Sequence, residues 1–137
     1  FKYFKKMKDF KNFIISLFLW ILCIFLVLPI SFINLVCVLI KYKSIKGYFL
    51  STAVSFDRWA NREFRTLWNM CLIKQKVSLH HFGHIEETIS SVLGKNEVCK
   101  TLTVTGKILC FILNTIDKNH CNKSIDYNIR YNRYEYI

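Results

Sequence analysis

The chain has 137 residues, of which 53% are hydrophobic, and it carries a formal net charge of +11. This length allows one membrane segment and one small domain, and its four isolated glycines exclude a glycine-rich phosphate-binding loop. Residues 1–73 hold 11 Lys and Arg against 3 Asp and Glu, whereas residues 74–137 hold 9 against 6. Because the excess of positive charge lies beside the most apolar segment, it favours contact with anionic lipid over contact with a nucleic acid.

Residues 1–12 alternate lysines with aromatic residues, which predicts a basic interfacial lead into a membrane. Residues 13–40 follow, and these 28 residues contain no charged side chain. About 20 apolar residues are enough to cross a bilayer as a helix, so this segment predicts a transmembrane anchor. Pro29 could kink the helix or mark a re-entrant turn, but each arm of such a turn would be too short to span.

The charges beside the anchor bear on its orientation. Five lysines precede it, and four cations follow it closely, from Lys41 to Arg58, so the full count decides nothing. If translation starts at Met7, two lysines precede the anchor and four cations follow it closely, and Arg62 and Arg65 add to those that follow. The apolar run exceeds the 7–15 residues typical of a signal peptide, so we expect an uncleaved single-pass anchor with its C-terminal side in the cytoplasm.

Residues 41–73 read as a basic linker followed by an amphipathic helix. Apolar residues recur there at steps of three and four, at Ala53, Phe56, Ala60, Phe64, Leu67 and Cys71. This stripe could pack on the C-terminal domain as a core face, or it could lie in the membrane interface. The tryptophans and arginines around it favour the interface, and they are Arg58, Trp59, Arg62, Arg65 and Trp68.

Residues 74–126 predict a small helical domain, so that the whole chain is all-α. A loop over 74–84 leads to a helix over 85–93, with Glu86 and Glu87 in its first turn and Gly94 as its C-terminal cap. A second loop precedes a core helix that Thr105 would cap, with an apolar face formed by Ile108, Leu109, Phe111, Ile112 and Ile116. A further partial helical turn follows, and the tail 127–137 lacks a core pattern.

Two polar motifs lie at the ends of these helices. The first holds Glu86, Glu87, Thr88, Ile89, Ser90, Ser91, Gly94 and Lys95, and the second holds Asp117, His120, Cys121, Lys123, Ser124 and Ile125. Because buried polar groups need partners, we expect the motifs to meet through Glu87 or Thr88 and His120, with Cys121 packed alongside.

Both motifs, in this order, resemble those of small membrane-anchored proteins encoded by tailed phages and prophages. In that family an (E/D)ETISSxxG(K/R) element precedes a helix that is closed by a DxxHCxxS(I) element. The resemblance covers residues 50–126 and implies a provenance, with location in a bacterial inner membrane, but no established activity.

The histidines, cysteines and carboxylates of this region also suggest a zinc site, a nucleophilic cysteine or disulfide bonds. Zinc prefers His, Cys and carboxylate ligands, and the candidates are His81, His84, Glu87, His120 and Cys121, although no CxxC pair is present. A nucleophilic Cys121 activated by histidine lacks an evident orienting partner. Cys71, Cys99, Cys110 and Cys121 would pair only in an oxidising compartment, and the expected orientation keeps them reduced.

These observations predict a non-enzymatic membrane protein without a cofactor or a small-molecule substrate. Its expected partners are the bilayer, through anionic lipid, and a host or phage protein. The alternatives are a zinc module built on the His/Cys/Glu cluster and a membrane-tethered nucleic-acid-binding protein.

Overall fold

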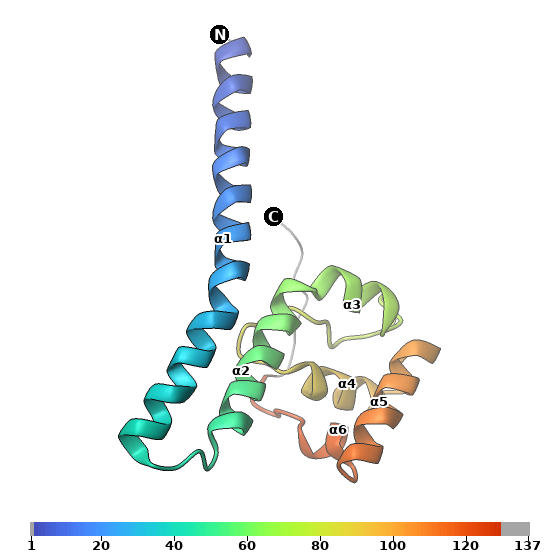
Figure 1. Ribbon diagram of the computed structural model, residues 1–137. Coiled ribbons are helices and arrows are strands. Elements are labelled where there is room, and N and C mark those ends of the chain that lie inside the picture. Colours follow the sequence, from blue (N-terminus) through green and yellow to red (C-terminus); the bar gives the residue numbers. More distant parts are fainter. Residues whose placement is uncertain (1, 130–137) are drawn as a thin grey trace. The chain divides into compact units, whose positions relative to one another are not determined.

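The computed structural model describes residues 2–129, with side chains from Asp9 onward, and divides the chain into two compact units at residues 46 and 47. The described residues form six α-helices and no strand, which confirms the all-α prediction (Figure 1). The helices are α1 (Lys2–Tyr42), α2 (Tyr48–Glu63), α3 (Arg65–Cys71), α4 (Ile89–Val98), α5 (Val104–Ile116) and α6 (His120–Lys123). Of the predicted tail, residues 130–137 lie outside this description.

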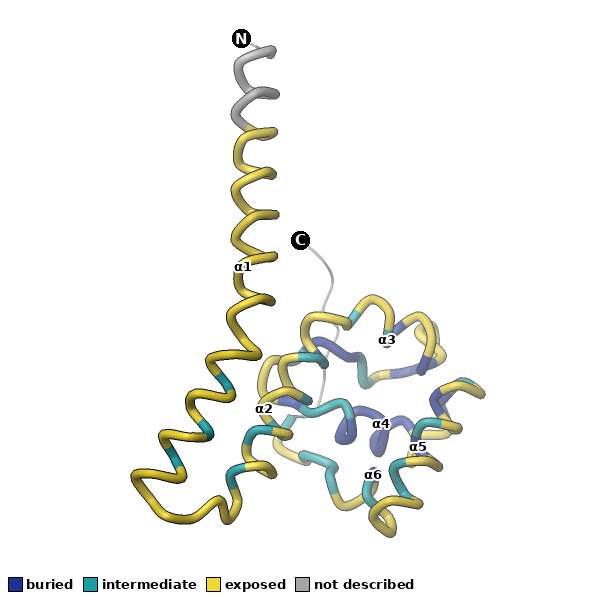
Figure 2. Tube along the Cα trace, viewed as in Figure 1, coloured by how far each residue is buried: buried dark blue, intermediate teal, exposed yellow. Residues whose placement is uncertain are grey.

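The first unit is the long helix α1. It includes the predicted anchor and the basic lead, and it continues through Pro29 without a break, so the re-entrant alternative is wrong. Its section Asp9–Tyr42 is long and apolar enough to cross a membrane. Large hydrophobic side chains are exposed all around it, among them Phe25 and Leu28 at 75% each (Figure 2).

The second unit begins at Gly47, whose φ of +78° suits glycine, and its core lies among α3, α4, α5 and α6. The fully or nearly fully buried apolar residues are Leu72, Ile73, Phe82, Val92, Leu93, Leu102, Cys110 and Cys121. The segment 41–73 is predicted to precede the small domain, but its helices α2 and α3 belong to the same compact unit as the C-terminal helices.

The inward face of α2 and α3 is polar. Asn61 and Asn69 are buried, whereas Phe56, Phe64 and Leu67 are 43–51% exposed, so the apolar stripe is not a core face. The asparagines face inward because the long loop before α4 has backbone groups that need partners. Asn69 accepts a hydrogen bond from the N–H of Phe82 at 2.8 Å and donates to the Phe82 carbonyl at 3.1 Å.

Asn61 holds the same loop closer to α4. It accepts from the N–H of Gly83 at 3.1 Å and donates to the carbonyls of His84 and Glu87 at 3.0 and 2.7 Å. Asn96, on α4, donates to the His80 carbonyl at 2.8 Å. Side-chain amides thereby replace secondary structure as partners of the loop backbone.

Helix α4 begins and ends later than the predicted helix 85–93. Thr88 is the N-cap, and its hydroxyl accepts from the N–H of Ser91 at 3.1 Å, so Glu86 and Glu87 precede the helix rather than forming its first turn. Gly94 lies inside the helix and is not its C-cap. Position 94 is glycine because of helix packing, since a Cβ there would lie 2.1 Å from the Cys121 carbonyl oxygen on α6.

Helix α5, in contrast to α4, begins earlier than predicted. Thr103, and not Thr105, is its N-cap, accepting from the N–H of Gly106 at 3.1 Å. The Thr103 hydroxyl donates in turn to the Cys71 carbonyl at 2.5 Å, which joins α5 to the end of α3. A tertiary partner therefore decides between two threonines that are equally good caps by sequence.

The predicted core face of α5 is mostly wrong. Of the five residues assigned to it, Leu109 packs on the core, but Ile108, Phe111, Ile112 and Ile116 are 47–79% exposed. The inward face is built instead from Gly106 and Cys110, with Leu109 and Leu113 beside them.

Candidate functional site

The two polar motifs meet in the second unit, through Ser90 rather than through Glu87 or Thr88. His120, at the start of α6, has its Nε2 atom 3.2 Å from the Ser90 hydroxyl on α4. Its Nδ1 atom lies 3.1 Å from a carboxylate oxygen of Asp117. Asn119 has a φ of +61° immediately before His120, and asparagine tolerates this conformation better than most residues.

A third helix contributes a side chain that sequence reasoning did not select. Asp57, on α2, accepts from the N–H of Ile89 at 3.3 Å and from the Ser90 hydroxyl at 3.5 Å. Burial raises the pKa of the Asp57 carboxyl, and its hydrogen bonds to Ile89 and Ser90 oppose this rise. We call Asp57, Ser90, His120 and Asp117 the polar clasp, because they connect α2, α4 and α6.

The clasp has the order of groups found in a serine hydrolase, with a carboxylate, an imidazole and a hydroxyl in sequence. Such an enzyme also needs N–H donors for the negative charge that develops on the substrate oxygen. Here the N–H of Ile89 already bonds Asp57, and that of Ser91 bonds Thr88. Since the Asp57 carboxylate also lies beside the Ser90 hydroxyl, it would oppose that charge, and the arrangement favours a connection between helices over a hydrolytic site.

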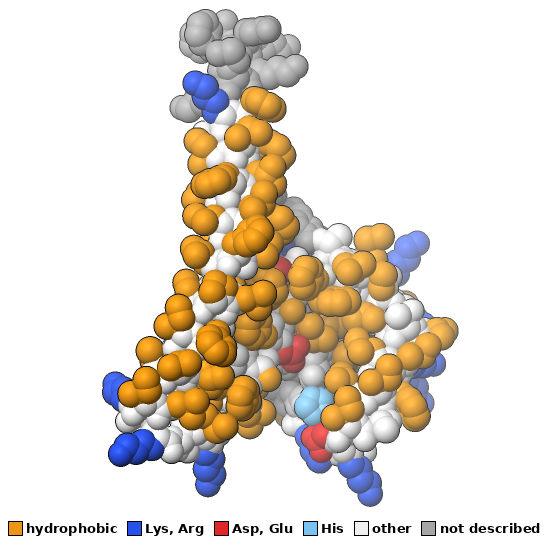
Figure 3. Space-filling view, viewed as in Figure 1, with side chains coloured by type: hydrophobic (Ala, Val, Ile, Leu, Met, Phe, Trp, Pro, Cys, Tyr) orange, Lys and Arg blue, Asp and Glu red, His pale blue; other side chains and the backbone are white. Residues whose placement is uncertain are grey.

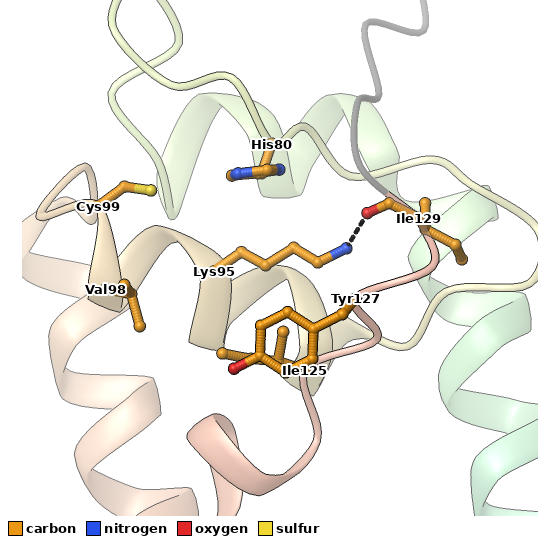
Figure 4. Close-up of a pocket in the computed structure, with 7 residues that line it drawn as sticks. All are labelled: His80, Lys95, Val98, Cys99, Ile125, Tyr127 and Ile129. Atoms are coloured by element: carbon orange, nitrogen blue, oxygen red, sulfur yellow. Dashed lines mark hydrogen bonds between the residues drawn. The ribbon is translucent and has the colours of Figure 1, made fainter.

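A buried ion pair joins Lys95 on α4 to Glu87, which lies just before that helix. Glu87, 2% exposed, accepts hydrogen bonds from the Ser91 hydroxyl at 2.7 Å and from the ammonium of Lys95, 7% exposed. The Lys95 ammonium also donates to the Ile129 carbonyl (Figure 4). The motif residues Glu87, Ser91 and Lys95 thus act together, whereas Glu86 is exposed.

The second motif closes on α4 through its backbone and its cysteine. Cys121 is fully buried, its backbone carbonyl lies against Gly94, and its thiol lies 3.8 Å from the Cys110 carbonyl oxygen. The N–H of Cys121 donates to Asn114 at 3.0 Å. Burial raises the pKa of both thiols, Cys110 and Cys121, which leaves Cys121 a poor nucleophile. Ser124 is half-buried in the segment that leads back over α4.

The zinc candidates are not brought together. Among the residues that the structure describes, no three His, Cys, Asp or Glu side chains are placed to hold a metal ion. His81 contacts the Ser78 carbonyl at 3.0 Å, and His84 accepts from the N–H of Glu86 at 3.2 Å. Glu87, His120 and Cys121 have the separate partners given above, so the spacing of these residues in the sequence does not become a shared site.

A pocket of about 320 Å³ opens beside the ion pair (Figure 4). It is lined by His80, Lys95, Val98, Cys99, Ile125, Tyr127 and Ile129. The stem of Lys95 crosses it, but the ammonium already contacts Glu87 and a carbonyl. The positive charge of Lys95 is therefore matched within the protein, which argues against a pocket built for an anionic ligand.

The predicted membrane-interface residues divide into two groups. Arg58, Trp59 and Arg62 are exposed on α2. Trp68 is half-buried against the core and donates to the Ala60 carbonyl at 3.2 Å, and half-buried Arg65 donates to the Arg62 carbonyl at 2.9 Å. The rings of Trp59, Phe64 and Trp68 stack edge to face, with centroids 5.6 and 5.9 Å apart.

Comparison of the chain with protein-family models, with curated proteins and with solved structures gave no match. The candidate site is therefore interpreted from its own geometry.

The contact between Ser90 and His120 predicts energetic coupling. Ser90→Ala and His120→Ala should each lower the free energy of unfolding, and the double variant should lose less than the sum, by about 0.5–3 kcal/mol. Urea titration of the full chain in detergent micelles measures this cycle. As a control, the effects of Thr103→Ala and His120→Ala should be additive, because Thr103 caps the start of α5 and His120 follows the end of that helix. Additivity in the Ser90–His120 cycle would contradict the clasp.

Proposed function

We propose that this chain is a small, non-enzymatic integral membrane protein of the phage or prophage type. Its N-terminal helix would hold the helical unit at the membrane, where that unit contacts a host or phage protein. The observation that carries the proposal is the helix α1, of which the section Asp9–Tyr42 is long and apolar enough to cross a membrane and has no buried residue. Exposed apolar surface of this extent is typical of a membrane-embedded segment.

The polar network of the second unit supports a role without catalysis. Ser90, His120 and Asp117 are engaged with one another in the clasp, and Glu87 is engaged with Lys95. Their joint effect is to fix α2, α4 and α6 to one another. A rigid helical unit with exposed apolar helices suits binding, and the resemblance of its two motifs to phage membrane proteins agrees with this proposal.

We place the anchor in a bacterial inner membrane, with the second unit in the cytoplasm. The basis is the charge count for a chain that starts at Met7, with two lysines before the anchor and four cations after it. Cys99 is exposed and reports on this orientation, whereas Cys121 is buried and would be shielded on either side. Labelling of Cys99 in intact cells by a membrane-impermeant thiol reagent would contradict the cytoplasmic placement.

The anchor predicts how the protein fractionates. The unaltered chain should stay with the membranes through alkaline carbonate washing. Leu22→Arg and Phe25→Arg should each add about 2.5–3.5 kcal/mol to the cost of insertion, so the double variant should be released in large part. Val77→Arg, at a residue 66% exposed in the second unit, is the matched control and should be retained. Release of the unaltered chain would refute the anchor.

A further inference from the structure

Helix α5 is apolar on both of its sides. Its inward side packs on the core through Gly106, Leu109, Cys110 and Leu113. Its outward side carries five large apolar residues that are 47–79% exposed, namely Val104, Ile108, Phe111, Ile112 and Ile116, which we call the α5 stripe. An exposed apolar surface of this size on a small helical unit is normally covered, so the stripe indicates a surface that another apolar phase covers.

The stripe cannot turn inward to bury itself. The inward side of α5 is fitted closely to the end of α3, where a Cβ at Gly106 would lie 2.2 Å from the Leu72 carbonyl oxygen. The N-cap Thr103 also bonds the Cys71 carbonyl, which fixes the rotation of the helix. Figure 3 shows hydrophobic side chains gathered over α3 and α5 on the viewed face of this unit.

The charges around the stripe indicate what covers it. Three exposed lysines flank or interrupt α5, namely Lys100, Lys107 and Lys118. The acidic side chain among them in the sequence, Asp117, is paired with His120 and with Lys123 at 3.1 Å. An apolar strip bordered by cations complements an anionic lipid surface, with acyl chains under the strip and headgroup phosphates at its edges.

We infer that α5 lies in the plane of the membrane interface, with the α5 stripe in the acyl boundary of a leaflet that contains anionic lipid. This inference rests on the proposed anchor and adds a second lipid contact to it. Thirteen residues form a helix of about 20 Å, too short to span a bilayer but suited to lie along one. Only residues 43–47 connect α1 to α2 along the chain, so the anchor and the second unit are held by a short tether.

Photo-crosslinking of the full chain in vesicles tests the inference. p-Benzoylphenylalanine replaces Phe111 in the stripe, and the vesicles contain phosphatidylcholine with phosphatidylglycerol. The same probe at Phe25 reports on the anchor, and at Gln75, an exposed loop residue of the second unit, it serves as the control. We expect lipid adducts by mass spectrometry at positions 111 and 25 but not at 75. In phosphatidylcholine alone, the yield at position 111 should fall roughly fivefold or more, while that at position 25 should not change.

The probes separate failure of this inference from failure of the anchor. A lipid adduct at position 25 without one at position 111 would overturn the interfacial placement of α5 and leave the anchor standing. Absence of lipid adducts at both positions would overturn both proposals. A crosslink from position 111 to protein, in a second copy or in another segment of the same chain, would show that protein and not lipid covers the stripe.

Discussion

Replacing Lys95 by methionine is expected to lower the free energy of unfolding by about 3–5 kcal/mol. Methionine keeps an apolar stem of similar length but removes the ammonium, so Glu87 remains as a buried carboxylate without its cation. Glu87 is 2% exposed, and water cannot compensate for the loss. Urea titration of the full chain in detergent micelles, followed by tryptophan fluorescence, measures the change, because Trp68 packs against the core.

The matched control removes both charges at once. In the double variant Glu87→Gln/Lys95→Met no buried charge is left unpaired, and glutamine can still accept from the Ser91 hydroxyl. Most of the lost stability should return, since replacing a buried ion pair by neutral groups is often close to neutral. A single variant that changes stability by less than about 0.5 kcal/mol, the usual range for surface substitutions, would contradict a buried pair.

Replacing Gly94 by alanine should destabilise the second unit by about 1–3 kcal/mol or more. In the interior of a helix this substitution ordinarily stabilises, by roughly 0.5–1 kcal/mol. Here the added Cβ would lie 2.1 Å from the Cys121 carbonyl oxygen and 2.8 Å from a side-chain carbon of Ile125. The carbonyl oxygen belongs to the backbone, so it cannot move aside as the end of a flexible side chain could. The close packing of α4 on α6 therefore reverses the usual sign, and the same urea titration measures it.

Val98→Ala tests whether the effect at position 94 is specific to packing. Val98 is 62% exposed on the same helix, so this variant should stay within about 0.5 kcal/mol of the unaltered chain. An increase in stability on Gly94→Ala would mean that α4 and α6 do not approach each other closely.

The residues missed by sequence reasoning have a common character. Asp57, Asn61 and Asn69 lie on the polar side of an amphipathic segment, where periodicity places them in solvent. The structure turns them inward because a long loop without secondary structure needs hydrogen-bond partners. A sequence signal does exist in retrospect. The two asparagines lie eight residues apart on the α2–α3 segment, and a loop rich in histidines follows.

The contact between the motifs could be predicted in kind but not in detail. Sequence reasoning required buried polar groups of one motif to find partners in the other, and Ser90 and His120 do so. The predicted partners, Glu87 and Thr88, are engaged elsewhere: Glu87 pairs with Lys95 on α4, and Thr88 caps that helix. The pairing depends on where α4 begins, and Thr88 and Asp57 decide that together.

Local patterns in the chain were enough to predict the long apolar helix, the all-helical character and the chain positions of both motifs. These depend on local rules, namely a run of 28 uncharged residues, helical periodicity and capping residues close in the chain. Contacts between distant parts of the chain determine which side of α2 and of α5 faces the core, which threonine caps α5, and why position 94 is glycine. Each of those depends on a partner distant in sequence, such as a loop carbonyl, the end of α3 or the backbone of α6, and periodicity alone cannot supply it.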